Sequence, residues 1–473
     1  MSDESPQHPT SNDDRNGWSA YWTAQGMPWR TEPEIDEGRQ AYLADRRAVK
    51  PDIERGIYPF RDVNGSIKLT RADVEWLLAM HVSGGMRGPV DWGNEAQRSR
   101  EGLDLRGAEL TDVGLDGLPL ARLCGGLTPG EQATAHPEQM KRAAIRLVDA
   151  SLRGAHLEGA MLGASLLERA DCTEAHLEDC TLELAYLTWS NLTGAHLERA
   201  NLITATLLRA RLSGAHLERA NLRSALLGQA QMEGAHLEGA HLGWAHLEGA
   251  FLRGAWLTDA TLNDFAGVRA HEKGWPLTSS LGSEAHLEGA TLNQVHAERA
   301  DLRRAHLEGA SLVLAHLEGA NLREVRLTGA NLSGANLEGA DLRRAWCHGA
   351  NFSDAHRVRA EPAEAHLEGA NLSDARLEGA FLCGVHLAGA TLDGAHLERA
   401  DMRGAQLDAK QMPPEDVQRV RQWLSDFPEW NPAVRLEPAH LDTTTALPSG
   451  TRPPAPPPLH IQSRLRWASD NQA

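Results

Sequence analysis

Five histidines recur every 20 residues in the middle of the chain, and a glutamate follows each of them two residues later. These residues are His156, His176, His196, His216 and His236, with Glu158, Glu178, Glu198, Glu218 and Glu238. Imidazole and carboxylate groups bind transition metals, and histidine also titrates near neutral pH. The spacing therefore suggests either a metal site or a stripe of side chains that responds to pH.

A shorter period determines how these residues are positioned. From Ile145 to Leu407 most blocks of five residues begin with Ala and have Leu in third place. In an α-helix this spacing would rotate successive leucines by about 140° and bury no stripe. In a straight strand an odd spacing would send them to alternate faces. The chain must therefore bend once per block, with Ala and Leu inward, the residue between them outward, and the last two residues at the corner. One such block is Ala155, His156, Leu157, Glu158 and Gly159.

The 20-residue period of the histidines equals four blocks, so four blocks most simply make one coil with a square section. With these features the chain resembles the bacterial-type pentapeptide-repeat family over more than half of its length. The resemblance implies an all-β repeat fold, a right-handed quadrilateral β-helix with four pentapeptides per coil. The repeat is long enough for about 13 coils, or about 60 Å at a strand spacing of about 4.8 Å. The chain departs from the family pattern at the outward position, where His often replaces Asp or Asn.

The flatness of such a face favours the pH-responsive stripe over a metal site. Zinc sites close a tetrahedron and hold their ligands by further hydrogen bonds, and a flat ladder offers neither. A solvated face of His–Glu pairs is the simpler interpretation. The chain has 22 His and a formal charge of −18, so protonation should remove most of its negative charge. We predict that between about pH 7 and 5.5 the rods begin to self-associate. No cofactor is expected.

Other parts of the chain differ from the repeat in composition. Thr31 and Glu34, with Pro33 between them, predict a helix that reaches Val49. A second helix is predicted from Thr70 to Met80. The expected regions are a disordered or docking segment at 1–30, a small and mostly helical N-terminal region at 31–100 that covers the first coil, the β-helix at 101–410, a C-terminal capping helix at 411–430, and a Pro-rich disordered tail at 431–473.

Two interruptions break the repeat, at 121–144 and 263–284. The first contains Gly125-Gly126 and Pro129-Gly130, which predict a protruding loop. The second leaves two alternatives open, a degenerate coil or an inserted loop. Arg357 and Pro362, which stand at inward positions, mark a smaller irregularity.

Composition limits the class of protein. The five cysteines include no Cys-x-x-Cys pair, and Cys172, Cys180 and Cys347 replace interior residues, which predicts buried thiols in a reducing compartment. No segment has the roughly 20 apolar residues of a membrane span, and the N-terminus is polar and acidic. We therefore expect a cytoplasmic protein without a membrane partner. Direct nucleic-acid binding is not expected of so acidic a chain.

No phosphate-binding loop, nucleophile elbow or zinc-ligand spacing occurs, so we expect no enzymatic activity. The resemblance implies an alternative function, because some members of the family imitate DNA and bind or protect a type II topoisomerase such as DNA gyrase. Between Ile145 and Lys410 there are 35 Asp and Glu against 24 Lys and Arg. This net charge is far sparser than the roughly one charge per 1.7 Å of DNA. Several arginines beside the glutamates dilute it further, namely Arg199, Arg219, Arg299 and Arg399.

A protein-binding rod or scaffold of unknown partner is the function that we favour. Exposed aromatic side chains on a polar surface are typical of binding sites. Trp244, Phe251 and Trp256 stand outward on consecutive blocks, directly before the interruption that holds Phe265 and Trp275. These five are candidate protein-binding residues, although the rings could instead pack the interruption against the rod. The apolar side of the C-terminal helix could also join two copies into a homodimer.

Overall fold

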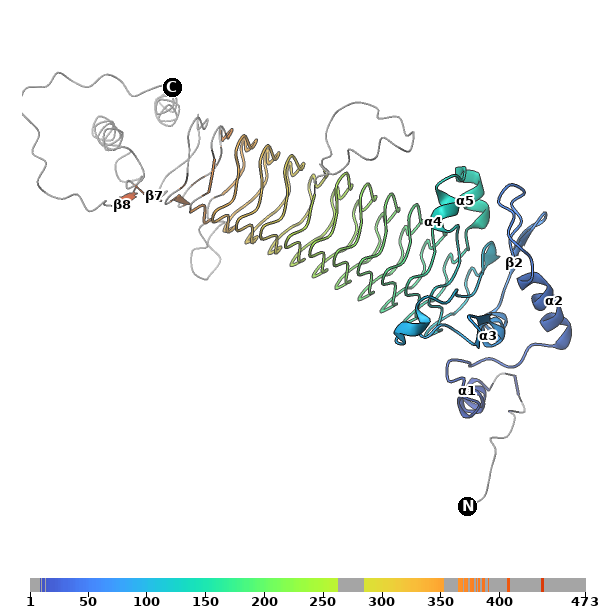
Figure 1. The fold of residues 1–473 in the computed structure, drawn as a ribbon. Helices are drawn as coiled ribbons and strands as arrows, with labels where there is room; N and C mark the ends of the chain where they lie inside the picture. Colours follow the sequence, from blue (N-terminus) through green and yellow to red (C-terminus); the bar gives the residue numbers. More distant parts are fainter. Residues whose placement is uncertain are drawn as a thin grey trace, which may run out of the picture. The chain divides into compact units, whose positions relative to one another are not determined.

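The structure is a computed structural model that forms two compact units, residues 1–236 and 237–473 (Figure 1). It describes residues 9, 11–12, 14–262, 285–352, 365–368, 370–372, 375–377, 380, 382, 385–387 and 390, and the strands at 406–408 and 435–437. None of the helices in this described part is long and apolar enough to cross a bilayer.

The first helix lies in the segment that precedes residue 31. Helix α1 (Arg15–Ala24) begins at Asp14, whose carboxylate accepts a hydrogen bond from the Gly17 amide at 2.9 Å. Trp18 and Trp22 are buried. The Arg30 guanidinium lies 3.6 Å from the centre of the Trp22 ring. The described part of this segment is therefore folded and docked rather than disordered.

Helix α2 (Glu37–Arg47) begins later than the sequence predicts. Its first turn is capped by Asp36, whose carboxylate accepts from the Arg39 amide at 2.9 Å. Thr31 does not cap this helix, because its amide and hydroxyl donate to Glu75 at 3.0 and 3.1 Å and its hydroxyl oxygen accepts from Arg71 at 3.0 Å. Helix α3 (Arg71–Met80) agrees with the prediction, and Thr70 and Asp73 form its capping box.

The N-terminal region also contains strands, which corrects the prediction of a mostly helical region. Strands β1 (Arg61–Asp62) and β2 (Gly65–Lys68) form one antiparallel pair, and β3 (Val82–Ser83) and β4 (Met86–Arg87) form another. A short 3-10 helix follows at Glu95–Gln97. Strand β2 pairs in parallel with β5 (Ala108–Glu109), which belongs to the first coil. The N-terminal region thus supplies hydrogen bonds to an edge that would otherwise be unpaired.

The coils of the first unit repeat with the register that the sequence predicts. His156 pairs with His176, and every further outward residue up to position 216 pairs in parallel with the residue 20 positions later. Four such pairings occur per coil. At each one, two hydrogen bonds join neighbouring coils: Leu157 N–H donates to the His176 carbonyl at 2.7 Å, and His176 N–H donates to the Ala155 carbonyl at 2.9 Å. We call each column of paired outward residues a ladder.

Alanine and leucine fill the inside of the coils. Ala215 is fully buried and Leu217 is 1% exposed. Cys172, Cys180 and Cys347 are buried free thiols, as predicted. Burial raises the pKa of the Cys172 thiol to about 12, so it stays protonated and unreactive at neutral pH.

The last residue of each block turns the corner in the left-handed backbone region. Gly159 has a φ of 64°, and Arg199 and Thr204 adopt 59° and 56° at equivalent corners. For residues other than glycine this conformation costs roughly 1–2 kcal/mol. The hydrogen bonds between coils and the buried leucines offset that cost, which explains why the corners tolerate many residue types.

The first interruption is helical rather than a loop, which corrects the prediction for 121–144. Helices α4 (Pro129–Gln132) and α5 (Pro137–Ala143) leave the stack after Cys124. Coil pairing continues past them, because Pro119 pairs with His156 and Cys124 with Met161.

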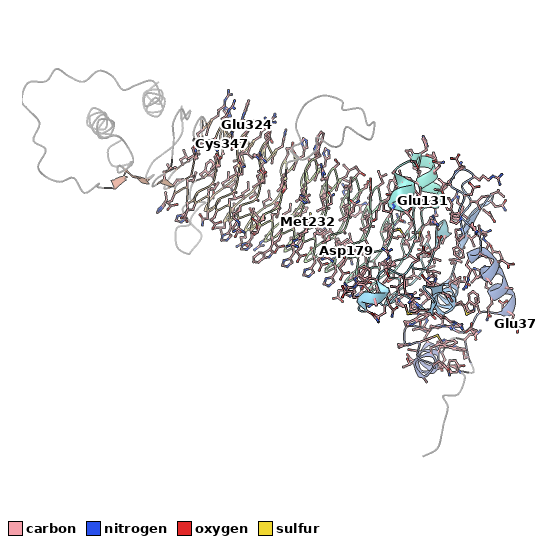
Figure 2. The ribbon with its side chains drawn as sticks, viewed as in Figure 1. Glu37, Glu131, Asp179, Met232, Glu324 and Cys347 are labelled. Carbon is pink, nitrogen blue, oxygen red and sulfur yellow. The ribbon has the colours of Figure 1, made fainter. Side chains whose placement is uncertain are left out.

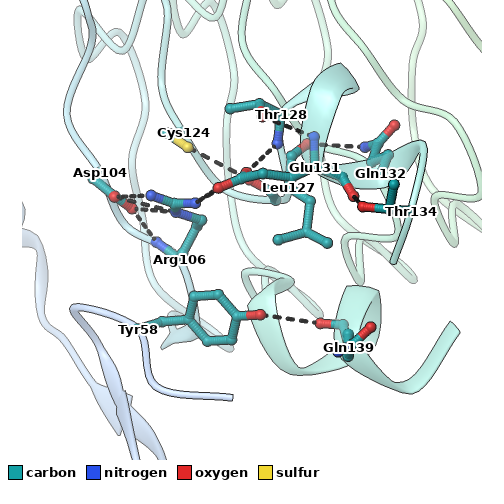
Figure 3. A network of polar contacts seen from close by, with 11 residues as sticks. Tyr58, Asp104, Arg106, Cys124, Leu127, Thr128, Glu131, Gln132, Thr134 and Gln139 are labelled. Carbon is teal, nitrogen blue, oxygen red and sulfur yellow. Dashed lines mark hydrogen bonds and ion pairs between the residues drawn. The ribbon is translucent and has the colours of Figure 1, made fainter. Parts of the chain in front are cut away.

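A polar network holds the two inserted helices in place (Figure 3). The Arg106 guanidinium forms ion pairs with Asp104 at 2.7 Å and with Glu131 of α4 at 3.1 Å. The Tyr58 hydroxyl donates to the carbonyl of Gln139 in α5 at 3.4 Å. These contacts join the N-terminal region, the first coil and the insertion.

In the second unit the pairing decides between the two alternatives for residues 263–284. His246 pairs directly with His286, and Phe251 pairs with Thr291. The coil before the interruption therefore stacks on the coil after it, with no further coil between them, so this segment is an insertion. The smaller irregularity, marked by Arg357 and Pro362, is also an insertion, because Asn336 pairs with His366 rather than with the residue 20 positions later.

Parallel pairing continues to the last described strands. Strand β6 (His386–Leu387) pairs with β7 (Gln406–Asp408), which pairs with β8 (Arg435–Glu437). Strand β8 falls in the predicted disordered tail, so at least these three residues are in a sheet. The predicted capping helix at 411–430 lies outside the described residues.

Candidate functional site

The five histidines of the first unit form one ladder, which we call the histidine ladder. Their side chains project outward from successive coils, as Figure 2 shows for the coils in general. Neighbouring rings are parallel to within 5°. Their centroids lie 4.6, 5.0, 4.8 and 4.9 Å apart along the series from His156 to His236. The structure thus brings together all five predicted histidines.

Four of the histidines lie beside the glutamate that follows them. The Nδ1–Oε1 distance is 3.0 Å for His156 and Glu158, and 3.2 to 3.3 Å for the next three pairs. The second carboxylate oxygen of these four glutamates is buried and accepts no hydrogen bond from the described residues. Glu158 is the most enclosed of the paired glutamates, with 6% of its side chain exposed. Trp92 covers this end of the ladder, since a Cβ placed on Gly159 would lie 3.0 Å from its ring.

The ladder is better arranged for proton binding than for metal binding. His156, Glu158 and His176 offer ligand atoms within 4.8 Å of one another. Tetrahedral zinc with bonds of about 2.0–2.1 Å needs ligand nitrogens near 3.4 Å apart that point at one centre. The His156 and His176 rings are parallel to within 3°, so their lone pairs point in the same direction rather than converge. Rings would have to turn out of the stack to hold a metal ion.

The hydrogen bond from His156 to the Glu158 carboxylate raises the pKa of this histidine, although partial burial opposes the shift. Glu178 of the next coil raises it further. The neighbouring His176 ring would oppose protonation once it is itself charged.

This shift predicts that His156 stabilises the protein more in mild acid than in mild base. Because the folded pKa of His156 exceeds its unfolded value of about 6.5, the stabilisation is complete below that pH and is lost as pH rises through the folded pKa. Burial lowers the pKa of His81, which acts in the opposite direction, so the contribution of His156 is measured as a difference between two proteins. The melting temperature of the unchanged protein minus that of His156→Gln should fall from about pH 6 to 8.5. A constant difference over this range would contradict the assignment.

The second unit contains two shorter stacks. Trp256 stacks on His296 at 4.0 Å, and His296 stacks on His316 at 4.7 Å. His246 and His286 begin another ladder, with centroids 5.0 Å apart, that the sequence analysis missed. His316 pairs with Asn336 and Asn336 with His366, so the interruption between these two residues shifts the 20-residue count by about half a coil, and His366 and His386 continue the His316 ladder. His356 and His396, which a strict 20-residue count would place there, lie outside the described residues.

The candidate aromatic residues do not form one patch. Trp244, Phe251 and Trp256 are 39%, 44% and 39% exposed. Trp244 stands at a corner with a φ of 64°, and the block of His246 separates it from Phe251. The blocks are therefore not consecutive, and the corner of Trp244 is diagonally opposite the corner that the faces of Phe251 and Trp256 share. Phe265 and Trp275 lie outside the described residues.

These features define a repeat β-helix whose outward residues form ladders. The family model described as pentapeptide repeats matches the chain in eight copies, over residues 145–183, 185–223, 225–264, 283–319, 320–356 and 364–407. The chain belongs to the pentapeptide-repeat family. No curated protein gives a match.

Solved structures of other pentapeptide-repeat proteins are similar to parts of the chain. HetL, involved in heterocyst differentiation regulation in the cyanobacterium Nostoc, is 32% identical over 50% of this chain and 89% of its own, with a TM-score of 0.24. A protein from the thylakoid lumen of Arabidopsis thaliana is 28% identical over 30% and 71%, with a TM-score of 0.10. QnrB1, a plasmid-mediated fluoroquinolone resistance protein, is 15% identical over 44% and 84%, with a TM-score of 0.19.

Proposed function

We propose that the chain is a non-enzymatic scaffold that binds another protein along its outer ladders. The observation that carries this proposal is the contrast between inside and outside. The interior positions hold close-packed alanine and leucine, whereas the outward residues keep fixed neighbours in the adjoining coils. Such a surface presents side chains in a rigid arrangement, which lowers the entropy cost of binding.

The proposal also covers the geometry of the β-helix and the cellular compartment of the protein. The β-helix is right-handed and four-sided with about 13 coils. The protein acts in the cytoplasm.

Imitation of DNA is the weaker alternative because corner arginines neutralise outer carboxylates. Arg199 pairs with Asp179 of the preceding coil at 2.6 Å, and Arg299 pairs with Asp259 at 2.8 Å. Arg169 pairs with Asp149 in the same way. A surface that imitates a duplex needs a continuous row of unpaired negative charges.

Affinity capture with the full chain tests the proposal. We expect Phe251→Thr combined with Trp256→Thr to lower recovery of the captured partner at least tenfold with little change in melting temperature. The two rings lie on adjacent outer faces, 44% and 39% exposed and outside the Ala–Leu interior, so their loss removes contact area rather than core packing.

The control is Trp346→Thr, which removes a ring of similar exposure at another rung of the same unit. If the Phe251→Thr and Trp256→Thr variant were less stable but still recovered the partner fully, the two rings would only pack against neighbouring parts of this chain. Recovery of a type II topoisomerase would favour DNA imitation, and failure to recover any protein would contradict the scaffold.

A further inference from the structure

Between Leu166 and Leu226 one ladder of the first unit is mainly apolar, whereas the other three are mainly polar. Leu166, Tyr186, Thr206 and Leu226 pair in succession, each 20 residues after the one before. The histidine ladder lies ten residues away along each coil, on the opposite side. The two remaining ladders carry mainly polar residues, such as Asn191 and Arg211 in one and Thr181 and Asn201 in the other.

Further apolar side chains widen this ladder at both edges. Trp189 is 55% exposed, the highest value for a described tryptophan, and Leu208 on the next coil is 39% exposed. Leu184 and Ile203 stand half-buried at the opposite corner. The four ladder residues are half-buried, and with the exposed Trp189 and Leu208 they make an apolar strip on one face of an otherwise polar coil, which indicates a surface that another molecule covers.

We propose that this strip, Leu166, Tyr186, Thr206 and Leu226 with Trp189 and Leu208, is a docking surface for a short amphipathic helix of a partner protein. The inference rests on the proposed scaffold function and names one of its surfaces. The helix lies along the ladder, its apolar side against the strip and an acidic residue beside Arg209.

The dimensions of the strip fit a helix. Rungs repeat every 4.8 Å or so and helix turns every 5.4 Å or so, so three turns stay in step with three rung intervals to within about 2 Å. Three rung intervals make the strip about 14 Å long from its first to its last rung. A stable dimer of two copies needs about 800 Å² from each partner, far more than such a strip provides.

The charge of the partner follows from Arg209. Its guanidinium lies 4.9 Å from the centre of the Trp189 ring, and its Nε donates to Gln229 at 2.8 Å. In the described part of the chain Arg209 has no carboxylate partner, whereas Arg169, at the same corner two coils earlier, pairs with Asp149. An acidic side chain on the docked helix would give Arg209 a carboxylate partner of the same kind.

Selection from a displayed library of helical peptides on the full chain tests the proposal. Binders should carry apolar residues at i, i+4 and i+7 with an acidic residue on one flank. We expect synthetic versions to lose at least tenfold in affinity, by fluorescence anisotropy, for the combined variant Leu166→Thr, Tyr186→Thr and Leu226→Thr. Threonine already stands at position 206 of this ladder, so the coils should keep their structure, and thermal melting checks this.

A charge exchange makes the test specific. Arg209→Glu should weaken the same peptide, and replacing the acidic residue of the peptide by Lys should restore binding to that variant. The control protein is the combined variant Phe251→Thr and Trp256→Thr, which should bind the selected peptides normally. Binders without the apolar spacing, or full binding to the threonine variant, would overturn the docking surface. Peptides that bind the threonine variant of the strip but fail to bind the Phe251→Thr and Trp256→Thr control would also overturn the docking surface. That result would leave the proposed scaffold function intact.

Discussion

Leu217→Asp is expected to lower the free energy of unfolding by about 3–5 kcal/mol, the largest effect that we predict for a coil residue. Leu217 is 1% exposed and its amide donates to the His236 carbonyl, so its side chain cannot turn outward without breaking the coil. The leucines of the same interior column offer no hydrogen bond to a carboxylate. The aspartate would therefore be buried unpaired or would force the coil open.

Chemical denaturation measured by circular dichroism gives this free energy. The control is His216→Asn at the neighbouring outward position, where 34% of the side chain is exposed. Asparagine already occupies rungs of another ladder, at Asn201 and Asn221, so this change should cost little. Similar losses in the two variants would show that the inward and outward assignments are wrong.

Glu75→Ala is expected to release the segment that contains α1 and to cost about 3–5 kcal/mol. The Glu75 carboxylate is fully buried and accepts hydrogen bonds from the amides of Thr31 and Glu32 at 3.0 Å. It also pairs with Arg71 at 2.8 Å. Its loss leaves two partly buried amides without this acceptor and the Arg71 guanidinium without its carboxylate. Arg71 further donates to the carbonyls of Gly114 and Asp116, so the attachment of α3 to the first coil should weaken too.

Hydrogen exchange of residues 14–32 and thermal melting report the two parts of this effect. Exchange in α1 should become faster, and the melting temperature should fall. Glu54→Ala is the matched control because Glu54 is exposed on the same region. Unchanged exchange in α1 would mean that Trp18 and Trp22 hold the segment without Glu75.

The five-residue period was sufficient to predict which residues of the coils face inward. Leu217 and His216 illustrate this, the first buried and the second outward and half-buried. The reason is local. Each block contains its own bend and its own Ala–Leu pair, so the assignment of one block does not depend on distant parts of the chain.

The start of α2 shows where local reasoning fails. Thr31 has the sequence of a cap, but Glu75 in α3 takes both its amide and its hydroxyl. Asp36 caps the helix instead. A residue 44 positions away in the chain therefore decides the boundary, and no local pattern contains that information.

By itself the sequence determined the coil, its 20-residue length and the histidine ladder, because identical residues at a constant interval must become neighbours once the coil closes. Tertiary structure decided which residues meet across the insertions, such as His246 with His286 and Asn336 with His366, because an inserted segment and an irregular coil can have the same length. Leu166, Tyr186, Thr206 and Leu226 also share the 20-residue spacing, but they are unlike in type, so no repeated residue marks them in the sequence. The structure showed that exposed Trp189 and Leu208 widen this ladder, because exposure depends on the neighbouring coils.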